Sequence, residues 1–173
     1  HGLEATFMPK PYRDHAGSGA HLHVSLLDHA GHNIFAAEDP AGSPALRHAI
    51  GGLAATINDT MAVCAPTANS YRRFQPEAYV PLGPSWSVNN RGVAFRVPAG
   101  PPDSRRVEHR VAGADANPYL LAAMVLGGML RGIERQLDRA LAHRDLVGQP
   151  HAVGRQHAGQ RVHEHSLHAQ GIG

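Results

Sequence analysis

The stretch GSGAHLHVSL, residues 17–26, places polar side chains at every second position. These side chains are His21, His23 and Ser25, and aliphatic residues stand between them. Because successive side chains of a β-strand point to opposite faces, the alternation predicts a strand with one apolar and one polar face. Such a polar face can simply meet solvent in an antiparallel sheet. Two imidazoles in line favour instead a face that meets a metal ion or a phosphate.

Two later stretches repeat this pattern with charged side chains. In NRGVAFRVP, residues 90–98, Arg96 alternates with valine and phenylalanine, and Arg91 stands at the start of the run. In RRVEHRV, residues 105–111, three charged side chains share one face, namely Arg106, Glu108 and Arg110. Arginine binds carboxylate and phosphate through a forked set of donors. A sheet that gathers the three polar faces would hold cation ligands and anion-binding arginines on one concave surface.

A helix that packs behind this sheet is expected over residues 44–65. Ser43 is a good N-cap, Pro44 fits the first turn, and Pro66 ends the segment. Apolar side chains recur at spacings of four and three residues and predict one buried stripe. The stripe consists of Leu46, Ile50, Leu53, Ile57 and Met61.

A second helix is expected to begin at Asn117-Pro118 and to reach about residue 142. Its first half is apolar nearly all round, whereas its second half is amphipathic. Gly127 and Gly128 indicate close packing against a neighbouring element. Before the first helix, residues 28–32 (DHAGH) read as a hairpin turn that leads into a short strand.

Length, charge and cysteine usage limit the class of protein. The chain has 173 residues, 42% hydrophobic and 17% charged, which is typical of one globular domain. The net charge of +2 is too small to indicate nucleic-acid binding. The apolar run 119–130 is too short to cross a bilayer. The single cysteine, Cys64, excludes an internal disulfide and a cysteine-based zinc cluster and fits a reducing, cytoplasmic compartment. The start, HGLEATFMPK, has no signal-peptide pattern and reads as a chain entered midway.

The last 26 residues differ in character from the rest. Residues 148–173 contain five of the 14 histidines and show no helical or strand period. A disordered tail is expected there, with a histidine-based metal-binding tract as the alternative. The expected organisation is one folded unit over residues 1–147, followed by this tail.

Four motifs, in this order, resemble the glutamine synthetase family. They are ATFMPKPYRDHAGSGAHLHVSL, NSYRRFQP, NNRGVAFRVP and RRVEHRVAGADANPYLLAA. The resemblance covers about residues 1–142. The residues of the motifs are most similar to those of the branch that joins glutamate to polyamines or other amines. It implies an α+β fold, the C-terminal part of a catalytic half-barrel of antiparallel strands packed on helices. It also implies ATP-dependent joining of the γ-carboxylate of glutamate to ammonia or an organic amine, through γ-glutamyl phosphate, with Mg²⁺ or Mn²⁺.

The resemblance assigns roles position by position. His21 matches the histidine that binds the metal nearer the transferred phosphate, and Glu108 matches a carboxylate ligand of the second metal. The ATP-binding positions are His23, Ser25, Arg96 and Arg106. The glutamate-binding positions are Gly17, Arg73 and Arg110, and the catalytic positions are Arg91 and Tyr79. Each residue also has an ordinary interpretation, as a turn glycine, a structural histidine or a surface arginine.

Three positions depart from the family pattern. Ala16 stands where many members carry asparagine, and Asp103 stands where a nucleotide-contacting lysine is expected. Tyr79 stands where the family has a glutamate that helps to deprotonate the incoming amine, with Glu77 two residues away. A phenol is a poor base near neutral pH, but its ring can lie against a longer amine. The resemblance therefore favours an organic amine, and a two-residue shift of the alignment would return the base to Glu77.

Two hypotheses follow, because family members are much longer and form their active sites between neighbouring subunits of a ring. The chain is either the C-terminal part of a ligase that acts only within a full chain, or a truncated, non-enzymatic remnant. In the second case His21, His23 and the tail would bind metal. Magnesium needs several oxygen ligands, and among the matched positions only Glu108 supplies one, so the isolated chain is expected to be inactive.

Overall fold

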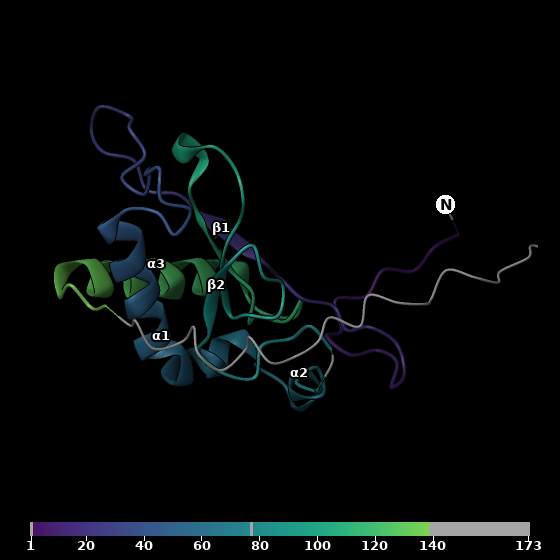
Figure 1. Ribbon diagram of the computed structural model, residues 1–173. Helices are drawn as coiled ribbons and strands as arrows, with labels where there is room; N and C mark the ends of the chain where they lie inside the picture. The colour runs from purple at the N-terminus through teal and green to yellow at the C-terminus, as the bar shows by residue number, and fades with distance from the viewer. Residues whose placement is uncertain (1, 77, 139–173) are drawn as a thin grey trace, which may run out of the picture.

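The computed structural model describes residues 2–76 and 78–138, which form a small sheet packed on two long helices (Figure 1). The elements in chain order are β1 (Leu22–Val24), α1 (Pro44–Cys64), α2 (Ala68–Tyr71), β2 (Trp86–Val88), β3 (Phe95–Val97), a 3₁₀ turn (Pro102–Ser104), β4 (Val107–His109) and α3 (Pro118–Glu134). The expected tail, residues 148–173, lies outside the described residues. No helix in the described part of the chain combines the length and the hydropathy that a membrane crossing needs.

The sheet has four short strands in the order β1-β4-β3-β2. The pairs β1–β4 and β4–β3 are antiparallel, which confirms the α+β class and the antiparallel arrangement of the three predicted strands. The fourth strand, β2, was not predicted, and it pairs with β3 in parallel. The sheet is therefore mixed, with the three predicted strands antiparallel and the additional strand parallel to its neighbour.

The period-two pattern sorts the side chains as expected. Val107 and Phe95 are buried on the helix side of the sheet, while His21 and His23 are about 40% exposed on the other side, at 39% and 42%. Glu108 departs from this simple pattern, because it belongs to the polar face and is nevertheless buried. The hairpin turn at residues 28–32 is present, but the strand after it is reduced to one bridge, Leu27 with Asn33.

Helix α1 begins and packs as predicted. The Ser43 side chain accepts a hydrogen bond from the Leu46 amide, and Pro44 occupies the first turn. Four of the five stripe residues are buried in the core and Met61 is partly buried, so the predicted stripe is confirmed.

Helices α1 and α3 lie side by side in direct backbone contact, made possible by glycine. A Cβ atom on Gly52 would lie 2.0 Å from the Gly128 carbonyl oxygen, and one on Gly132 would lie 2.1 Å from the His48 carbonyl oxygen. Neither position has room for a side chain. The predicted close packing at Gly128 is confirmed, whereas Gly127 faces open space on the other side of α3.

Helix α3 ends at Glu134, earlier than the predicted end near residue 142. Gln136 adopts a left-handed φ of 49°. The amide of Gln136 donates to the Ile133 carbonyl, and the amide of Leu137 donates to the Gly132 carbonyl. This is a Schellman-type termination, which glycine usually mediates, so the glutamine at this position gave no sequence signal.

Candidate functional site

The carboxylate of Glu108 lies at the centre of a polar cluster on the sheet face that points away from the helices. Arg110 Nη1 donates to its Oε1 atom at 2.6 Å, and Arg96 Nη1 donates to its Oε2 atom at 2.8 Å. His21 Nδ1 lies 3.1 Å from Oε1, and His23 Nε2 lies 3.7 Å from the same atom. The predicted convergence of His21, Arg96 and Glu108 is therefore confirmed.

Strand register brings these residues together. His23 on β1 and Arg96 on β3 both pair with Glu108 on β4, so the three side chains form one row on the same face. Ser87 on β2 pairs with Arg96 and extends the row across the fourth strand. The row mixes a carboxylate, a guanidinium and an imidazole that lie far apart in the sequence.

The cluster carries more positive than negative charge. Arg96 and Arg110 have side-chain exposures of 16% and 7%, and Glu108 is the carboxylate between them. Burial alone would raise the pKa of Glu108, but hydrogen bonds and charge from Arg96 and Arg110 hold that pKa below its ordinary value. Burial and the charge of Arg110 lower the pKa of His21, against the opposing charge of Glu108. The face therefore combines one ionised carboxylate with two guanidinium groups that donate charge-assisted hydrogen bonds to it.

Arg73 adds a second buried guanidinium beside this cluster. The residue is 3% exposed, and its Nη1 atom donates to the Val111 carbonyl at 3.2 Å. No carboxylate lies within ion-pair distance of it among the described residues. A Cβ atom on Gly19 would lie 2.8 Å from Arg73 Nη2 and 3.4 Å from His21 Nε2. Gly17 lies equally close, since its Cβ would be 3.0 Å from Arg73 Cγ.

A hydrogen-bond network that the sequence did not reveal ties Asp115 to α2, the helix that precedes Arg73. Ser70 Oγ donates to Asp115 Oδ2 at 2.6 Å, and Thr67 Oγ1 donates to the same oxygen at 3.0 Å. Thr67 and Ser70 also form the capping box of α2, the helix that precedes Arg73. The spacing of Thr67 and Ser70 could have predicted the capping box. It could not have predicted their partner Asp115, which lies 45 residues after Ser70. The second oxygen, Asp115 Oδ1, is buried and makes no hydrogen bond within the described residues.

The loop that contains Gly17 is anchored to the same helix. The Asn69 side chain accepts a hydrogen bond from the Lys10 amide at 2.8 Å and donates to the Lys10 carbonyl at 3.0 Å. The Lys10 ammonium donates to the His15 carbonyl across the loop. The amide of Ser18 donates to the Pro9 carbonyl and closes the loop. Lys10 and Asn69 were not singled out from the sequence.

Of the positions matched to ATP, His23 lies on edge strand β1, whereas Arg96 lies on the inner strand β3. Arg106 Nε donates to His23 Nδ1 at 3.3 Å, so these two residues are adjacent. Ser25 Oγ donates to the Arg105 carbonyl at 3.3 Å. Arg96 also donates to Asn89 Oδ1 at 2.7 Å, a partner that the sequence analysis did not identify.

Two predicted catalytic side chains lie apart from this network. The carbonyl of Arg91 accepts a hydrogen bond from Arg110 Nη2 at 2.9 Å, but its exposed guanidinium makes no hydrogen bond or ion pair with any described residue. Tyr79 is 74% exposed and has a left-handed φ of 51°, which is uncommon for a residue with a Cβ atom. Glu77, the alternative base, lies outside the described residues.

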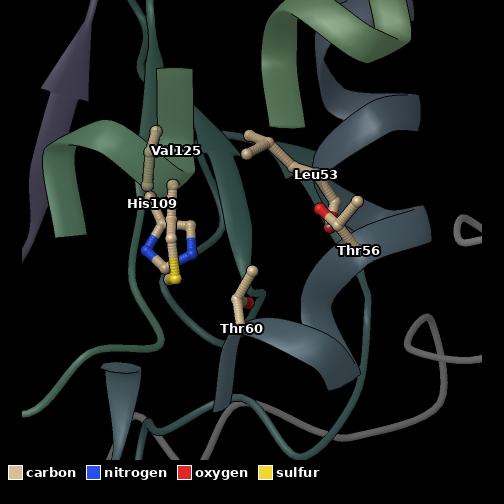
Figure 2. A pocket seen from close by; sticks show the side chains of 6 residues that line it. Leu53, Thr56, Thr60, His109 and Val125 are labelled. Carbon is tan, nitrogen blue, oxygen red and sulfur yellow. Dashed lines mark hydrogen bonds between the residues drawn. The ribbon is translucent and has the colours of Figure 1, made fainter. Parts of the chain in front are cut away.

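A cavity lies on the opposite side of the sheet, within the apolar core. It is lined by Leu53, Thr56 and Thr60 of α1, Met124 and Val125 of α3, and His109 of β4 (Figure 2). The ring of His109 packs on Phe95 with centroids 5.5 Å apart, and burial lowers its pKa to about 4. This cavity is an imperfectly filled part of the core and does not connect the polar residues described above.

The polar cluster supplies fewer oxygen ligands than a divalent cation needs. Mg²⁺ takes several oxygen ligands, whereas the cluster offers one carboxylate, both of whose oxygens accept hydrogen bonds from arginine. No group of three or more acidic, histidine or cysteine side chains among the described residues is arranged to hold a metal ion. These residues alone therefore do not form a complete magnesium site, and the assignment of His21 and Glu108 as metal ligands stays a prediction.

Comparison with known proteins gives a consistent result. Residues 1–157 match the family described as glutamine synthetase, catalytic domain. The chain is 48% identical over 137 residues to the gamma-glutamylputrescine synthetase of Escherichia coli, covering 79% of this chain and 29% of that protein. It is 43% identical over 138 residues to the glutamine synthetase of Pyrococcus furiosus, covering 80% and 31%.

Two further similarities are to a relative named for an ethanolamide and to a solved structure. The gamma-glutamylethanolamide synthetase of Streptomyces coelicolor is 39% identical over 137 residues, covering 79% of this chain and 29% of that protein. A solved structure of GmaS without ligand superposes with a TM-score of 0.70 at 39% identity, covering 80% of this chain and 31% of that one. The chain thus spans about 30% of the length of the relatives it matches.

Proposed function

Because this chain belongs to the glutamine synthetase family, we propose that its polar sheet face forms part of the active site of an ATP-dependent glutamate–amine ligase. The observation that carries the proposal is the cluster in which Glu108 binds Arg96 and Arg110. Beside it lies the buried Arg73, which has no carboxylate within ion-pair distance among the described residues. Such a face suits a reaction whose substrates, a carboxylate and a triphosphate, are both anions.

The proposed reaction has two balanced steps. An oxygen of the glutamate γ-carboxylate attacks the γ-phosphorus of ATP, and the bond to the β,γ-bridging oxygen breaks, so ADP leaves and γ-glutamyl phosphate forms. The amine nitrogen then attacks the γ-carbonyl carbon and gives up a proton, and the carbon–oxygen bond breaks to release inorganic phosphate. Both steps spread negative charge over phosphoryl oxygens, which positioned arginines stabilise.

The arginines divide between the two anions. Arg73 and Arg110, with Gly17 supplying close backbone approach, bind glutamate. Arg96 and Arg91 stabilise the phosphoryl group, and Glu108 keeps Arg96 and Arg110 in position through its two hydrogen bonds. ATP lies along the edge marked by His23, Ser25 and Arg106. A complete site also requires oxygen ligands for Mg²⁺ or Mn²⁺ from outside the described residues.

An organic amine is the proposed acceptor. Two relatives are named for products that contain an organic amine. They are the gamma-glutamylputrescine and gamma-glutamylethanolamide synthetases, which are 48% and 39% identical to the chain. An exposed Tyr79 at the position of the family's base supports an amine with an apolar stem. Glutamine synthetases at 43% identity support ammonia as the alternative acceptor.

The proposed setting is a cytoplasmic, ring-shaped homo-oligomer of full-length chains. The single, buried Cys64 fits a reducing compartment. No nucleic-acid or membrane partner is proposed. The alternative, a non-enzymatic remnant that binds metal through His21, His23 and the tail, rests on the same two imidazoles lying within 3.7 Å of Glu108.

A chimera provides the test of the anion-binding roles. Residues 1–138 of this chain replace the matched stretch of the E. coli gamma-glutamylputrescine synthetase, and steady-state phosphate release is measured against glutamate concentration. Arg73→Gln should lower kcat/KM for glutamate about 100-fold or more, because a charge-assisted bidentate contact is lost. The neighbouring Arg72 is exposed and provides the matched control. Arg72→Gln should change kcat/KM for glutamate less than about threefold. Equal effects of the two substitutions would refute the proposed role of Arg73.

A further inference from the structure

Lys10 is the only lysine of the chain, and the proposed reaction does not use it. The residue is 8% exposed, and among the described residues no carboxylate lies within ion-pair distance of its ammonium. Taking an ammonium group out of water costs free energy that only its remaining contacts can offset. Those contacts therefore indicate what the buried lysine does.

The Lys10 ammonium closes a loop across its middle. Its Nζ atom donates to the carbonyl of His15, five residues further along the chain. The two ends of the loop are held by the backbone, because the amide of Ser18 donates to the Pro9 carbonyl at 2.8 Å. Residues 9–18, here called the Lys10 loop, are thus closed once at the base by the backbone and once across the middle by a side chain.

Closure of the Lys10 loop places Gly17 against Arg73. A Cβ atom on Gly17 would lie 2.8 Å from the Pro9 carbonyl oxygen and 3.0 Å from Arg73 Cγ. Gly17 and Arg73 are two of the positions proposed above to bind glutamate. A displacement of about 1 Å is enough to spoil a binding geometry of this kind. The closed loop is therefore the form in which these two residues can act together.

The loop and the arginine share one support. The Asn69 side chain accepts a hydrogen bond from the Lys10 amide and donates one to the Lys10 carbonyl. Asn69 belongs to α2, which ends at Tyr71, two residues before Arg73. The backbone of Lys10 is thus held by contacts that do not need its side chain. This arrangement leaves the ammonium free for its hydrogen bond to His15.

We propose that Lys10 is a positioning residue for glutamate, because its ammonium keeps the Lys10 loop closed and so keeps the Gly17 backbone beside Arg73. The identity of the substrate rests on the proposed function, whereas the closure of the loop rests on the contacts of Lys10 alone.

Limited digestion with trypsin measures the closure without reference to activity. Arg13 lies in the loop and is exposed, so cleavage after Arg13 reports opening of the loop. Trypsin does not cleave before proline and Pro11 follows Lys10, so Lys10→Met removes no cleavage site. In the 173-residue chain Lys10→Met should raise the rate of cleavage after Arg13 about tenfold. The melting temperature should fall by no more than about 3 °C, because Asn69 still holds the Lys10 backbone.

Kinetics of the chimera defined above test the consequence for glutamate. Lys10→Met should raise KM for glutamate about tenfold and change kcat less than about threefold. Lys10→Arg keeps a charged donor and should bring KM back to within about threefold of the unsubstituted chimera. Arg13→Met is the matched control, because it removes the same charge from the same loop without removing the hydrogen bond to His15. It should leave KM unchanged.

Several results would overturn the proposal. They are an unchanged rate of cleavage after Arg13 in Lys10→Met, equal effects of Lys10→Met and Arg13→Met on KM, and a failure of Lys10→Arg to restore KM. A large loss of melting temperature in Lys10→Met would also overturn it, since that result assigns Lys10 to the fold as a whole. A chimera without substrate-dependent phosphate release would count against the proposed function, and the trypsin experiment would still decide whether Lys10 closes the loop.

Discussion

His21 Nδ1 and Glu108 Oε1 lie 3.1 Å apart although the two residues are 87 positions apart in the sequence. The contact joins strand β4 to the segment that leads into β1, and it places an imidazole on the same carboxylate that binds two arginines. Glu108 is therefore the residue on which the geometry of the polar face depends. Its removal should be costly for the fold as well as for the site.

Glu108→Ala should lower the free energy of unfolding of the isolated chain by about 3 kcal/mol, because it leaves the buried guanidinium groups of Arg96 and Arg110 without their carboxylate. Glu108→Gln keeps an acceptor oxygen and should cost less. Urea denaturation followed by circular dichroism measures both. The control is Arg47→Ala, which breaks a partly exposed pair with Asp39 and should cost about 1 kcal/mol or less. A Glu108→Ala loss no larger than that of the control would contradict this role.

The pH dependence of stability should contain a contribution from His109. Burial holds its folded-state pKa at about 4, below the ordinary value of 6.5, so the unfolded chain binds a proton that the folded chain does not. The stabilisation is complete above pH 6.5 and is lost as the pH falls toward 4. For this one group it amounts to about 3 kcal/mol. In His109→Phe the unfolding free energy should vary less over this window, and an unchanged pH profile would show that His109 protonates freely in the core.

The interface between α1 and α3 should be intolerant of any added carbon atom. Gly52→Ala places a Cβ against the Gly128 carbonyl, and it should destabilise the chain by about 3 kcal/mol, or prevent folding, because neither backbone can move freely. Gly127→Ala is the matched control on the exposed side of α3. It should stabilise the chain by up to about 1 kcal/mol, since alanine is the better helix former. Thermal melts measure the stability of both variants. A higher melting temperature for Gly52→Ala than for Gly127→Ala would contradict the helix packing described here.

The hydrogen bonds between Asp115 and α2 should be needed for the placement of Arg73. Asp115→Ala removes the acceptor for Ser70 and Thr67 and should lower stability by about 2 kcal/mol. Glu38→Ala, at an exposed position, should have little effect. In the chimera, Asp115→Ala should also raise KM for glutamate with a smaller change in kcat, because Arg73 loses its support. Stability loss without any change in KM would limit Asp115 to a structural role.

Much of the site followed from local patterns in the sequence. The period-two alternation predicted that His21, Arg96 and Glu108 share one face, since strand geometry fixes the direction of alternate side chains. Strand β2 gave no such alternation, and its parallel pairing with β3 depends on the path of the intervening loop. The hydrogen bond between Ser70 and Asp115 could not be predicted either, because these two residues meet only through tertiary packing. The early end of α3 was missed because glutamine occupies a position usually taken by glycine.

Acceptor choice should follow Tyr79. With the chimera, phosphate release is measured in parallel with ammonia, ethanolamine, putrescine and spermidine. An organic amine should give the highest kcat/KM, because a tyrosine at this position supplies no carboxylate to hold ammonium and remove its proton. The amine assignment is wrong if ammonia gives the highest kcat/KM and if Glu77→Gln abolishes ammonia-dependent phosphate release while Tyr79→Phe does not.

The central claim is that this chain supplies the anion-binding face of a ligase site that is completed elsewhere in the polypeptide. The most direct measurement is phosphate release in the presence of ATP, glutamate and putrescine, by the isolated chain and by the chimera side by side. The account predicts no release by the isolated chain. It predicts release by the chimera that needs all three substrates and falls at least about 100-fold in Glu108→Gln. Release by the isolated chain that Glu108→Gln abolishes, or a folded chimera without substrate-dependent release, would contradict it.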